Sequence, residues 1–261
     1  SARPSGLDLY EEVSPDGISS KQTVPVKVAS CSDEELWTAE IRNAKNALVK
    51  SYTWTGKAKD FDWDGTDDNG NKAADGAYSL KIASTDRAGN SGSASIQNIV
   101  VDTRPVSAFL TADFAGISPN GDSVLDAQKF NIKVSLNEGI SSWKFDIIDS
   151  ASGKAVKTFT EKDQADLPAA ITWAGETSSG KTAEGTFSAK LHIEYAKGNV
   201  ADAVSGSFIC TSKAPELVVK TTPEYFSPDN DGVDDEEIIQ LSCKTLANLK
   251  NWTFTIFNPI K

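Results

Sequence analysis

Apolar and polar residues alternate over many short stretches of this chain, and no long stretch shows helical periodicity. The alternation predicts strands with one buried face. Three of these stretches contain a Trp whose side chain shares a face with the residues two and four positions on. They are Trp37-Thr38-Ala39-Glu40-Ile41, Trp143-Lys144-Phe145-Asp146-Ile147 and Trp252-Thr253-Phe254-Thr255-Ile256. We expect each of these Trp residues to face a core.

A second Trp block occurs twice, and each copy leads through a glycine-containing loop into an alternating strand. The copies are Phe61-Asp62-Trp63-Asp64-Gly65 with Asp75-Gly76-Ala77-Tyr78, and Ile171-Thr172-Trp173-Ala174-Gly175 with Glu184-Gly185-Thr186-Phe187. The glycines suit tight turns that need positive φ. We expect Trp63 and Trp173 to lie in the cores as well.

A Ser-Pro turn followed by short acidic or amide side chains occurs three times. Its copies are Ser14-Pro15-Asp16-Gly17, Ser118-Pro119-Asn120-Gly121-Asp122 and Ser227-Pro228-Asp229-Asn230-Asp231-Gly232. The serines are 104 and 109 residues apart, which is the size of one domain per repeat. The pattern predicts domains at 1–104, 105–214 and 215–261, in which the repeated sequence begins at Pro4, Pro105 and Pro215.

About seven short strands in each full repeat predict an all-β fold of tandem immunoglobulin-like antiparallel β-sandwiches. The third repeat is incomplete, because its sequence stops just after the Trp-led stretch. Three explanations remain open: continuation in a longer protein, packing of a partial sheet on the second repeat or on another copy, and strand exchange with a partner. We favour continuation in a longer protein.

The motifs together resemble a known family. The Ser-Pro turn, the Trp-Asp-Gly to Asp-Gly-Ala-Tyr block and Asp86-Arg87-Ala88-Gly89-Asn90 are similar to the immunoglobulin-like domain of flagellar hook-capping proteins, and to repeats of gliding-motility-associated envelope proteins. The second repeat departs from the pattern, with Ala174 in place of Asp64 and Tyr195 in place of Asp86. The resemblance implies a structural role outside the cytoplasm, in the periplasm or at the cell surface.

The composition narrows the classes of partner that this chain is expected to bind. The 261 residues carry a formal net charge of −11, which argues against nucleic acid or an anionic membrane as a partner. No apolar run approaches the roughly 20 residues that span a bilayer, so we expect no membrane insertion. The odd set of three cysteines at non-equivalent positions, Cys31, Cys210 and Cys243, excludes a repeated disulfide. One isolated pair stays open as an alternative, and we expect buried thiols.

The acidic turns are candidate calcium loops. Asp229, Asp231 and Asp235 in the third repeat, and more sparsely Asp122 and Asp126 in the second, place carboxylates around a sharp bend, and calcium prefers such oxygen ligands. The alternative is that these side chains cap backbone N–H groups of the turn without any ion.

An enzyme is difficult to build from this sequence, and we expect none. Catalytic triads and most zinc sites need histidine, and the single His192 alternates with Leu191 and Ile193, so it faces away from the core. The glycine-rich loop of nucleotide-binding sites is also absent.

We therefore expect a non-enzymatic spacer and protein-interaction module of a bacterial envelope or motility-associated assembly. Its partners would be other envelope proteins or further domains of the same chain. Tyr52 and Trp54 are a candidate partner surface. The alternative is a carbohydrate-binding accessory module in which these two aromatic side chains contact a glycan.

Overall fold

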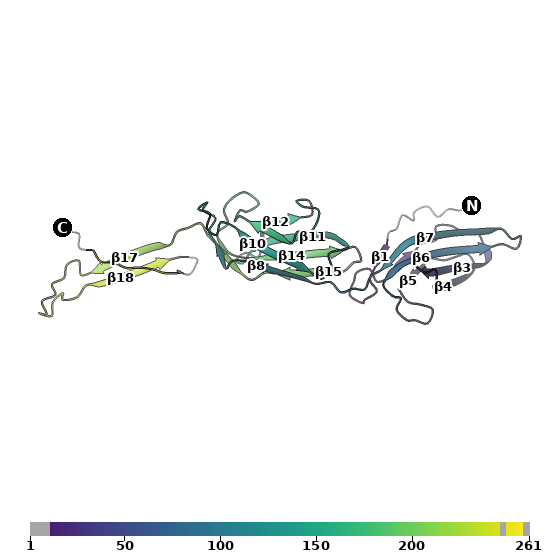
Figure 1. Cartoon of the computed structure of the whole chain (residues 1–261), viewed down its shortest axis with the longest axis horizontal. Helices are drawn as coiled ribbons and strands as arrows, with labels where there is room; N and C mark the ends of the chain where they lie inside the picture. Colours follow the sequence, from purple (N-terminus) through teal and green to yellow (C-terminus); the bar gives the residue numbers. More distant parts are fainter. Residues whose placement is uncertain (1–10, 246–248, 258–261) are drawn as a thin grey trace.

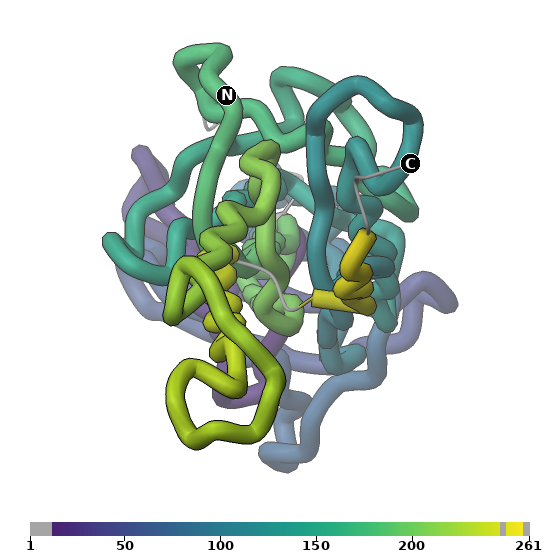
Figure 2. Tube along the Cα trace, turned by 90° about the vertical axis from the view of Figure 1, so that its left-hand side faces the viewer, coloured from purple at the N-terminus to yellow at the C-terminus, as the bar shows by residue number. Residues whose placement is uncertain are grey.

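The fold is described from a computed structural model, in which residues 11–245 and 249–257 are placed. These residues form strands and loops and contain no helix, so the predicted all-β class is confirmed. In this part of the chain no helix could cross a membrane. The molecule is elongated, and its three parts follow one another along the long axis (Figure 1). Figure 2 looks along this axis from the end at which β17 and β18 lie.

The described residues of the first repeat, from position 11 on, form seven strands in two sheets. The larger sheet has the order β1-β7-β6-β3-β4, and β2 pairs with β5 in the smaller one. The strands are β1 (Glu11–Val13), β2 (Val24–Val26), β3 (Glu34–Asn43), β4 (Leu48–Gly56), β5 (Phe61–Trp63), β6 (Gly76–Thr85) and β7 (Ser91–Val101). Trp63 and Tyr78 meet between the sheets, with ring centroids 5.0 Å apart, so this repeat has its own core.

The second repeat has the same plan, and its smaller sheet contains three strands. One sheet has the order β13-β10-β8 and the other β12-β11-β14-β16-β9, with β15 also paired to β14. The strands are β8 (Ala108–Ala112), β9 (Gly116–Ile117), β10 (Gln128–Val134), β11 (Ile140–Asp149), β12 (Ala155–Thr160), β13 (Ala170–Trp173), β14 (Gly185–Tyr195), β15 (Val200–Val204) and β16 (Phe208–Cys210).

Aromatic side chains join the two sheets of the second repeat. Phe130 of β10 lies 5.1 Å from Phe145 of β11 and 5.5 Å from Phe208 of β16, measured between ring centroids. Trp173 of β13 lies 5.6 Å from Phe187 of β14. These edge-to-face contacts follow from period-two strands that direct alternate residues inward. The sequence pattern therefore predicted both the strands and the side that is buried.

The third repeat is a two-stranded ribbon, β17 (Glu216–Thr222) paired antiparallel with β18 (Ile238–Lys244). The prediction of a third Trp-led strand was wrong, because residues 251–257 form no strand. Trp252 is 71% exposed, whereas its counterpart Trp143 is 3% exposed. The reason is that Trp143 packs between two sheets, and the described residues of the third repeat form one ribbon.

The expectation of buried thiols was correct for one cysteine. Cys210 is buried, Cys31 is half-buried and Cys243 is exposed, and all three are free. Burial, reinforced by the nearby Glu184 carboxylate, raises the pKa of the Cys210 thiol to about 12. This thiol therefore stays protonated, and it packs as a small apolar group.

The inter-sheet contacts of Phe130 can be tested by truncation. Phe130→Ala should lower the free energy of unfolding of the second repeat by about 3–5 kcal/mol, because it leaves a cavity between the sheets. Phe109→Ala is the control, since that side chain is 65% exposed and should cost little. Urea denaturation of both variants measures the difference. Equal stability of the two would contradict the described packing.

Candidate functional site: the joint between repeats and the acidic loops

The first Ser-Pro loop forms a joint with the second repeat. Beyond the turn, the Ser20 N–H donates to the carbonyl of Gly198 at 3.0 Å, in the hairpin between β14 and β15. The Asn199 amide donates to Oδ2 of Asp16 at 2.8 Å. These contacts connect residues about 180 positions apart and fix the two repeats against each other.

A buried lysine completes the joint. The Lys197 side chain is 2% exposed and points back to the linker between the repeats, where its Nζ donates to the carbonyl of Arg104. Nζ also lies 3.3 Å from Oδ1 of Asp102, whose other oxygen accepts from Arg104 at 2.8 Å. The carbonyl of Lys197 accepts from the Ser19 hydroxyl at 2.6 Å. Both its charge and its backbone are therefore satisfied across the joint.

Glycine is required at the closest approach of the two repeats. Gly198 has φ +86°, and a Cβ on it would lie 2.7 Å from the hydroxyl oxygens of Ser19 and Ser20. No side chain fits there without moving the first loop. The hairpin between β14 and β15 therefore contacts the neighbouring repeat as well as joining its two strands.

Two carboxylates in the joint are held in the ionised form. Burial opposes ionisation of Asp16, but hydrogen bonds from the Ser19 N–H and the Asn199 amide outweigh it and hold the pKa of Asp16 far below its usual range. The Arg104 guanidinium, assisted by Lys197, lowers the pKa of Asp102 to about 2 against the cost of burial. Both groups are thus charged at neutral pH.

The second and third Ser-Pro loops share one backbone conformation. Positive φ occurs at Gly121, Ser123 and Leu125, and at the three equivalent positions Asn230, Gly232 and Asp234. In the second loop Asp126 accepts from the N–H groups of Asn120, Gly121 and Ser123 at 2.7–3.0 Å. In the third loop Asp235 accepts from those of Asn230 and Gly232. Asp126 and Asp235 are therefore caps of their own loops.

The remaining candidate calcium ligands differ between the two loops. In the second loop the Asn120 amide donates to Oδ2 of Asp122 at 3.1 Å. In the third loop Asp229 takes the position of Asn120, so two carboxylates face each other. One oxygen each from Asp229, Asp231 and Asp235 lies within 4.8 Å of the others, the one such group found among the described residues. The structure thus brings together the three residues predicted for the third repeat.

The predicted aromatic surface lies over β4 and β5. The Tyr52 and Trp54 rings are stacked with centroids 6.1 Å apart, and both contact Phe61. Each is half-buried, so one face packs on the first core while the other is available at the surface. His192 lies on β14 between buried Leu191 and Ile193 and faces outward as predicted, 2.8 Å from Asp202.

The joint residues were missed in the sequence. Lys197 and Asn199 lie in a short hairpin loop and Asp102 lies in the linker, and their spacing in the sequence does not place them together. A lysine next to a hairpin glycine is common on surfaces, and its partner lies 95 residues away in the chain. The one available signal was the departure of Tyr195-Ala196-Lys197 from Asp86-Arg87-Ala88 at the equivalent hairpin.

One family model matches the chain. Residues 15–88 match the FlgD Ig-like domain. The resemblance seen in the motifs is therefore confirmed for most of the first repeat, from its Ser-Pro loop to the β6–β7 hairpin. None of the curated proteins matches this chain.

Solved structures similar to this chain include fibronectin-like modules, FlgD and a bacterial adhesin. The fibronectin(III)-like modules of Clostridium thermocellum CbhA are 15% identical over 77% of this chain and 90% of theirs, with a TM-score of 0.38. FlgD from Xanthomonas campestris is 28% identical over 29% of this chain and 62% of its own, with a TM-score of 0.22. A Ca2+-stabilised adhesin of an Antarctic bacterium is 20% identical over 76% of this chain, with a TM-score of 0.33. This chain spans 46% of that adhesin.

The joint should weaken in acid. Because the pKa values of Asp16 and Asp102 are lowered on folding, their contribution is fully present above about pH 4, the ordinary value of an aspartate. It is lost as the pH falls toward 2. We expect the stability difference between the native chain and Asp102→Asn to be largest near pH 7 and to shrink between about pH 4 and 2. Urea denaturation across this range measures it, with exposed Asp166→Asn as control. A difference independent of pH would show that ionised Asp102 does not hold the joint.

Proposed function

We propose that this chain is a stretch of a rigid, non-catalytic spacer in an extracytoplasmic bacterial assembly, and that it also presents surfaces for protein partners. The single observation that carries the proposal is the joint around buried Lys197. A flexible linker would leave two repeats free to rotate, but here the linker is short and its own carbonyl and carboxylate are bound by the next repeat. Such a joint holds one domain at a fixed distance from another.

The family match supports the location. The matching model is the FlgD Ig-like domain, and the FlgD structure from Xanthomonas campestris concerns the hook capping that is essential for flagellar assembly. The fold also suits a spacer, because the side chains described in both full repeats form the two cores and the joint between them. The partners in this proposal are other envelope proteins or further repeats.

Lys197→Met tests the spacer. Methionine keeps the length of the side chain but leaves the Arg104 carbonyl without its donor and Asp102 without one of its two cations. We expect small-angle X-ray scattering to change from the profile of a stiff, extended particle to that of two repeats with a wide range of angles. Lys190→Met, exposed on β14, is the matched control.

Circular dichroism of Lys197→Met should show that both repeats remain folded, so that a change in scattering reports on the joint. An unchanged profile would contradict the role of Lys197. A native chain that already scatters as a flexible particle would contradict the spacer itself.

A second proposal concerns the third loop, which we propose binds a divalent cation such as calcium. In the second loop the amide of Asn120 donates to Asp122. In the third loop Asp229 stands at the position of that amide, so the facing carboxylates of Asp229 and Asp231 lack a donor between them. Two ionised carboxylates at this distance repel, and a cation would neutralise them with oxygen ligands of the preferred kind.

The Asp229→Asn variant separates the structural role of this loop from its proposed binding of calcium. It should restore the arrangement of the second loop, raising thermal stability without calcium and removing the response to calcium. Calorimetric titration and melting at millimolar calcium measure both effects, and Asp231→Asn should also weaken binding. Glu224→Gln, exposed beside the loop, is the control. No heat and no shift in melting for the native chain would leave the loop purely structural.

A further inference from the structure

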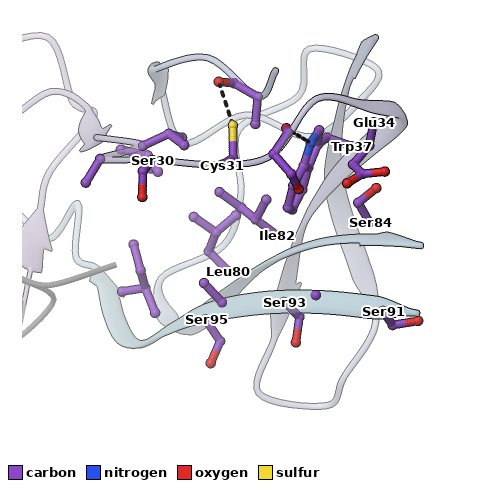
Figure 3. A pocket seen from close by; sticks show the side chains of 18 of the residues that line it. Ser30, Cys31, Glu34, Trp37, Leu80, Ile82, Ser84, Ser91, Ser93 and Ser95 are labelled. Atoms are coloured by element: carbon purple, nitrogen blue, oxygen red, sulfur yellow. Dashed lines mark hydrogen bonds between the residues drawn. The ribbon is translucent and has the colours of Figure 1, made fainter. Parts of the chain in front are cut away.

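The sandwich of the first repeat has two sides at which its sheets end. Figure 3 shows one of them, where Trp37, Leu80 and Ile82 point into a groove with Ser93 of β7 at its edge. This is the side on which β8 contacts β15 in the second repeat, and the repeat spacing assigns residues 4–10 to it. The other side lies between β4 and β5, and all residues around it are described. Its exposed groups therefore belong to the folded repeat itself.

The side between β4 and β5 is closed differently in the two full repeats. In the second repeat the long segment 161–169 connects β12 to β13, and its Leu167 packs on the core. In the first repeat only residues 57–60 connect β4 to β5. Aromatic rings close the gap instead, since the Phe61 centroid lies 4.4 Å from that of Tyr52 and 5.3 Å from that of Trp54. All three rings are half-buried, so the first repeat presents an aromatic surface where the second has a loop.

The indole N–H of Trp54 is available to a partner. In the same repeat Trp37 donates its indole N–H to the carbonyl of Ser32 at 3.2 Å, and Trp63 donates to that of Thr66 at 2.9 Å. Trp54 forms no such bond among the described residues. Tryptophan side chains with an apolar body and a free donor are enriched where proteins contact one another.

The outer edge of β4 carries unpaired backbone groups beside the aromatic surface. The Ser51 N–H donates to the carboxylate of Asp68, and the Val49 carbonyl accepts from the N–H of the same residue in the loop after β5. Backbone groups alternate in direction along a strand, so those of Thr53 and Thr55 also face away from β3. No hydrogen bond to them is present among the described residues. Unpaired edges of this kind bind extended polypeptides by main-chain hydrogen bonds.

The free edge ends at an acidic hollow. The end of β4 lines a cavity of about 670 Å³ and shares it with four carboxylates and one guanidinium. The guanidinium of Arg87 pairs with Glu35, and Asp86 accepts from backbone N–H groups of its own hairpin. Asp33 and Glu34 form no ion pair among the described residues. The hollow is therefore complementary to a Lys or Arg side chain.

From these features we propose that the side between β4 and β5 binds an extended, basic segment of another polypeptide. The segment adds to the edge of β4 through the backbone groups of Thr53 and Thr55. The residue opposite Trp54 is then at a non-hydrogen-bonded position, where side chains lie closest, and it carries a large apolar side chain. A Lys or Arg close to it in sequence enters the acidic hollow.

The exposed main chain favours a polypeptide over a glycan as the occupant, because alternating N–H and C=O groups match those of another extended chain. The inference rests on the interaction role proposed above and specifies its partner. It does not depend on the stiffness of the joint.

Selection from random peptides tests this surface. A phage-displayed library panned on the full chain should enrich peptides that share a large apolar residue, a Lys or Arg close to it and no proline between them. A fluorescently labelled copy of the most enriched peptide is then titrated with the full chain, and its anisotropy measures binding. Binding should weaken as salt is raised, because charges contribute to it.

Three variants address the three features separately. Trp54→Ala removes the ring that the apolar side chain contacts, Thr55→Pro removes an edge N–H, and Asp33→Asn removes a carboxylate of the hollow. The first two should weaken binding about tenfold or more, and the third should also reduce the salt dependence. Thr55 and Asp33 are exposed, so these two substitutions leave the core intact. Trp252→Ala and Asp166→Asn, at exposed positions elsewhere, are the matched controls and should bind as the native chain does.

Four results would overturn the proposal. They are enrichment of no peptide, equal binding to the native chain and to Thr55→Pro, self-association of the chain that Trp54→Ala abolishes, and binding of an arrayed glycan that Trp54→Ala abolishes. The third would assign the surface to a second copy and the fourth to carbohydrate. Scattering of the native chain and of Lys197→Met is measured separately, so failure of peptide binding is distinguishable from failure of the spacer.

Discussion

A single buried cation between two repeats determines how this molecule is organised. Removing a lysine ammonium from water costs several kcal/mol unless other groups replace the lost hydration. Lys197 finds those groups in the last residues of the neighbouring repeat, the Asp102 carboxylate and the Arg104 carbonyl. The charge is satisfied in one relative placement of the repeats, so other placements are disfavoured. Orientation is thus specified by a polar contact rather than by a large apolar interface.

The three Ser-Pro loops show how one backbone frame serves different purposes. In each, the N–H two residues after the serine donates to the serine carbonyl at 2.8 Å. In the first copy the side chains contact the next repeat, in the second they cap the loop itself, and in the third they gather carboxylates. Because the frame depends on turn geometry rather than on any one acidic residue, side chains can change without loss of the fold.

The strands and the cores could be read from the sequence because alternation reports directly on which side of a strand is buried. Trp63, Trp173 and Phe187 are examples, since each sits at a position that the period-two pattern directs inward. The pattern gave a wrong prediction of burial at Trp252. Burial of this side chain needs a second sheet that faces its strand, and alternation reports on one strand alone. It also failed for Cys243, because an apolar side chain is buried only where the surrounding sheets close.

The joint could not be read in this way. Contacts such as Asp16 with Asn199 depend on how two finished domains meet, and no local periodicity encodes them. The third acidic loop could be predicted from the sequence in part. Spacing alone suggested that Asp229, Asp231 and Asp235 converge, yet Asp235 caps its own loop as Asp126 caps the second one. The difference between the two loops is that Asp229 stands where the second loop has Asn120, whose amide donates to Asp122.

The parallel pairing of an early strand with the last strand of each full repeat has a mechanical consequence. In both full repeats a strand near the entry of the chain lies parallel to one near its exit, β1 with β7 and β9 with β16. Tension applied to the two ends would draw these neighbours in opposite directions along their length. Their hydrogen bonds would then be loaded together in shear, rather than opened one after another. An array built in this way resists stretching at each repeat, and the force reaches the next repeat through a linker that is itself bound to it.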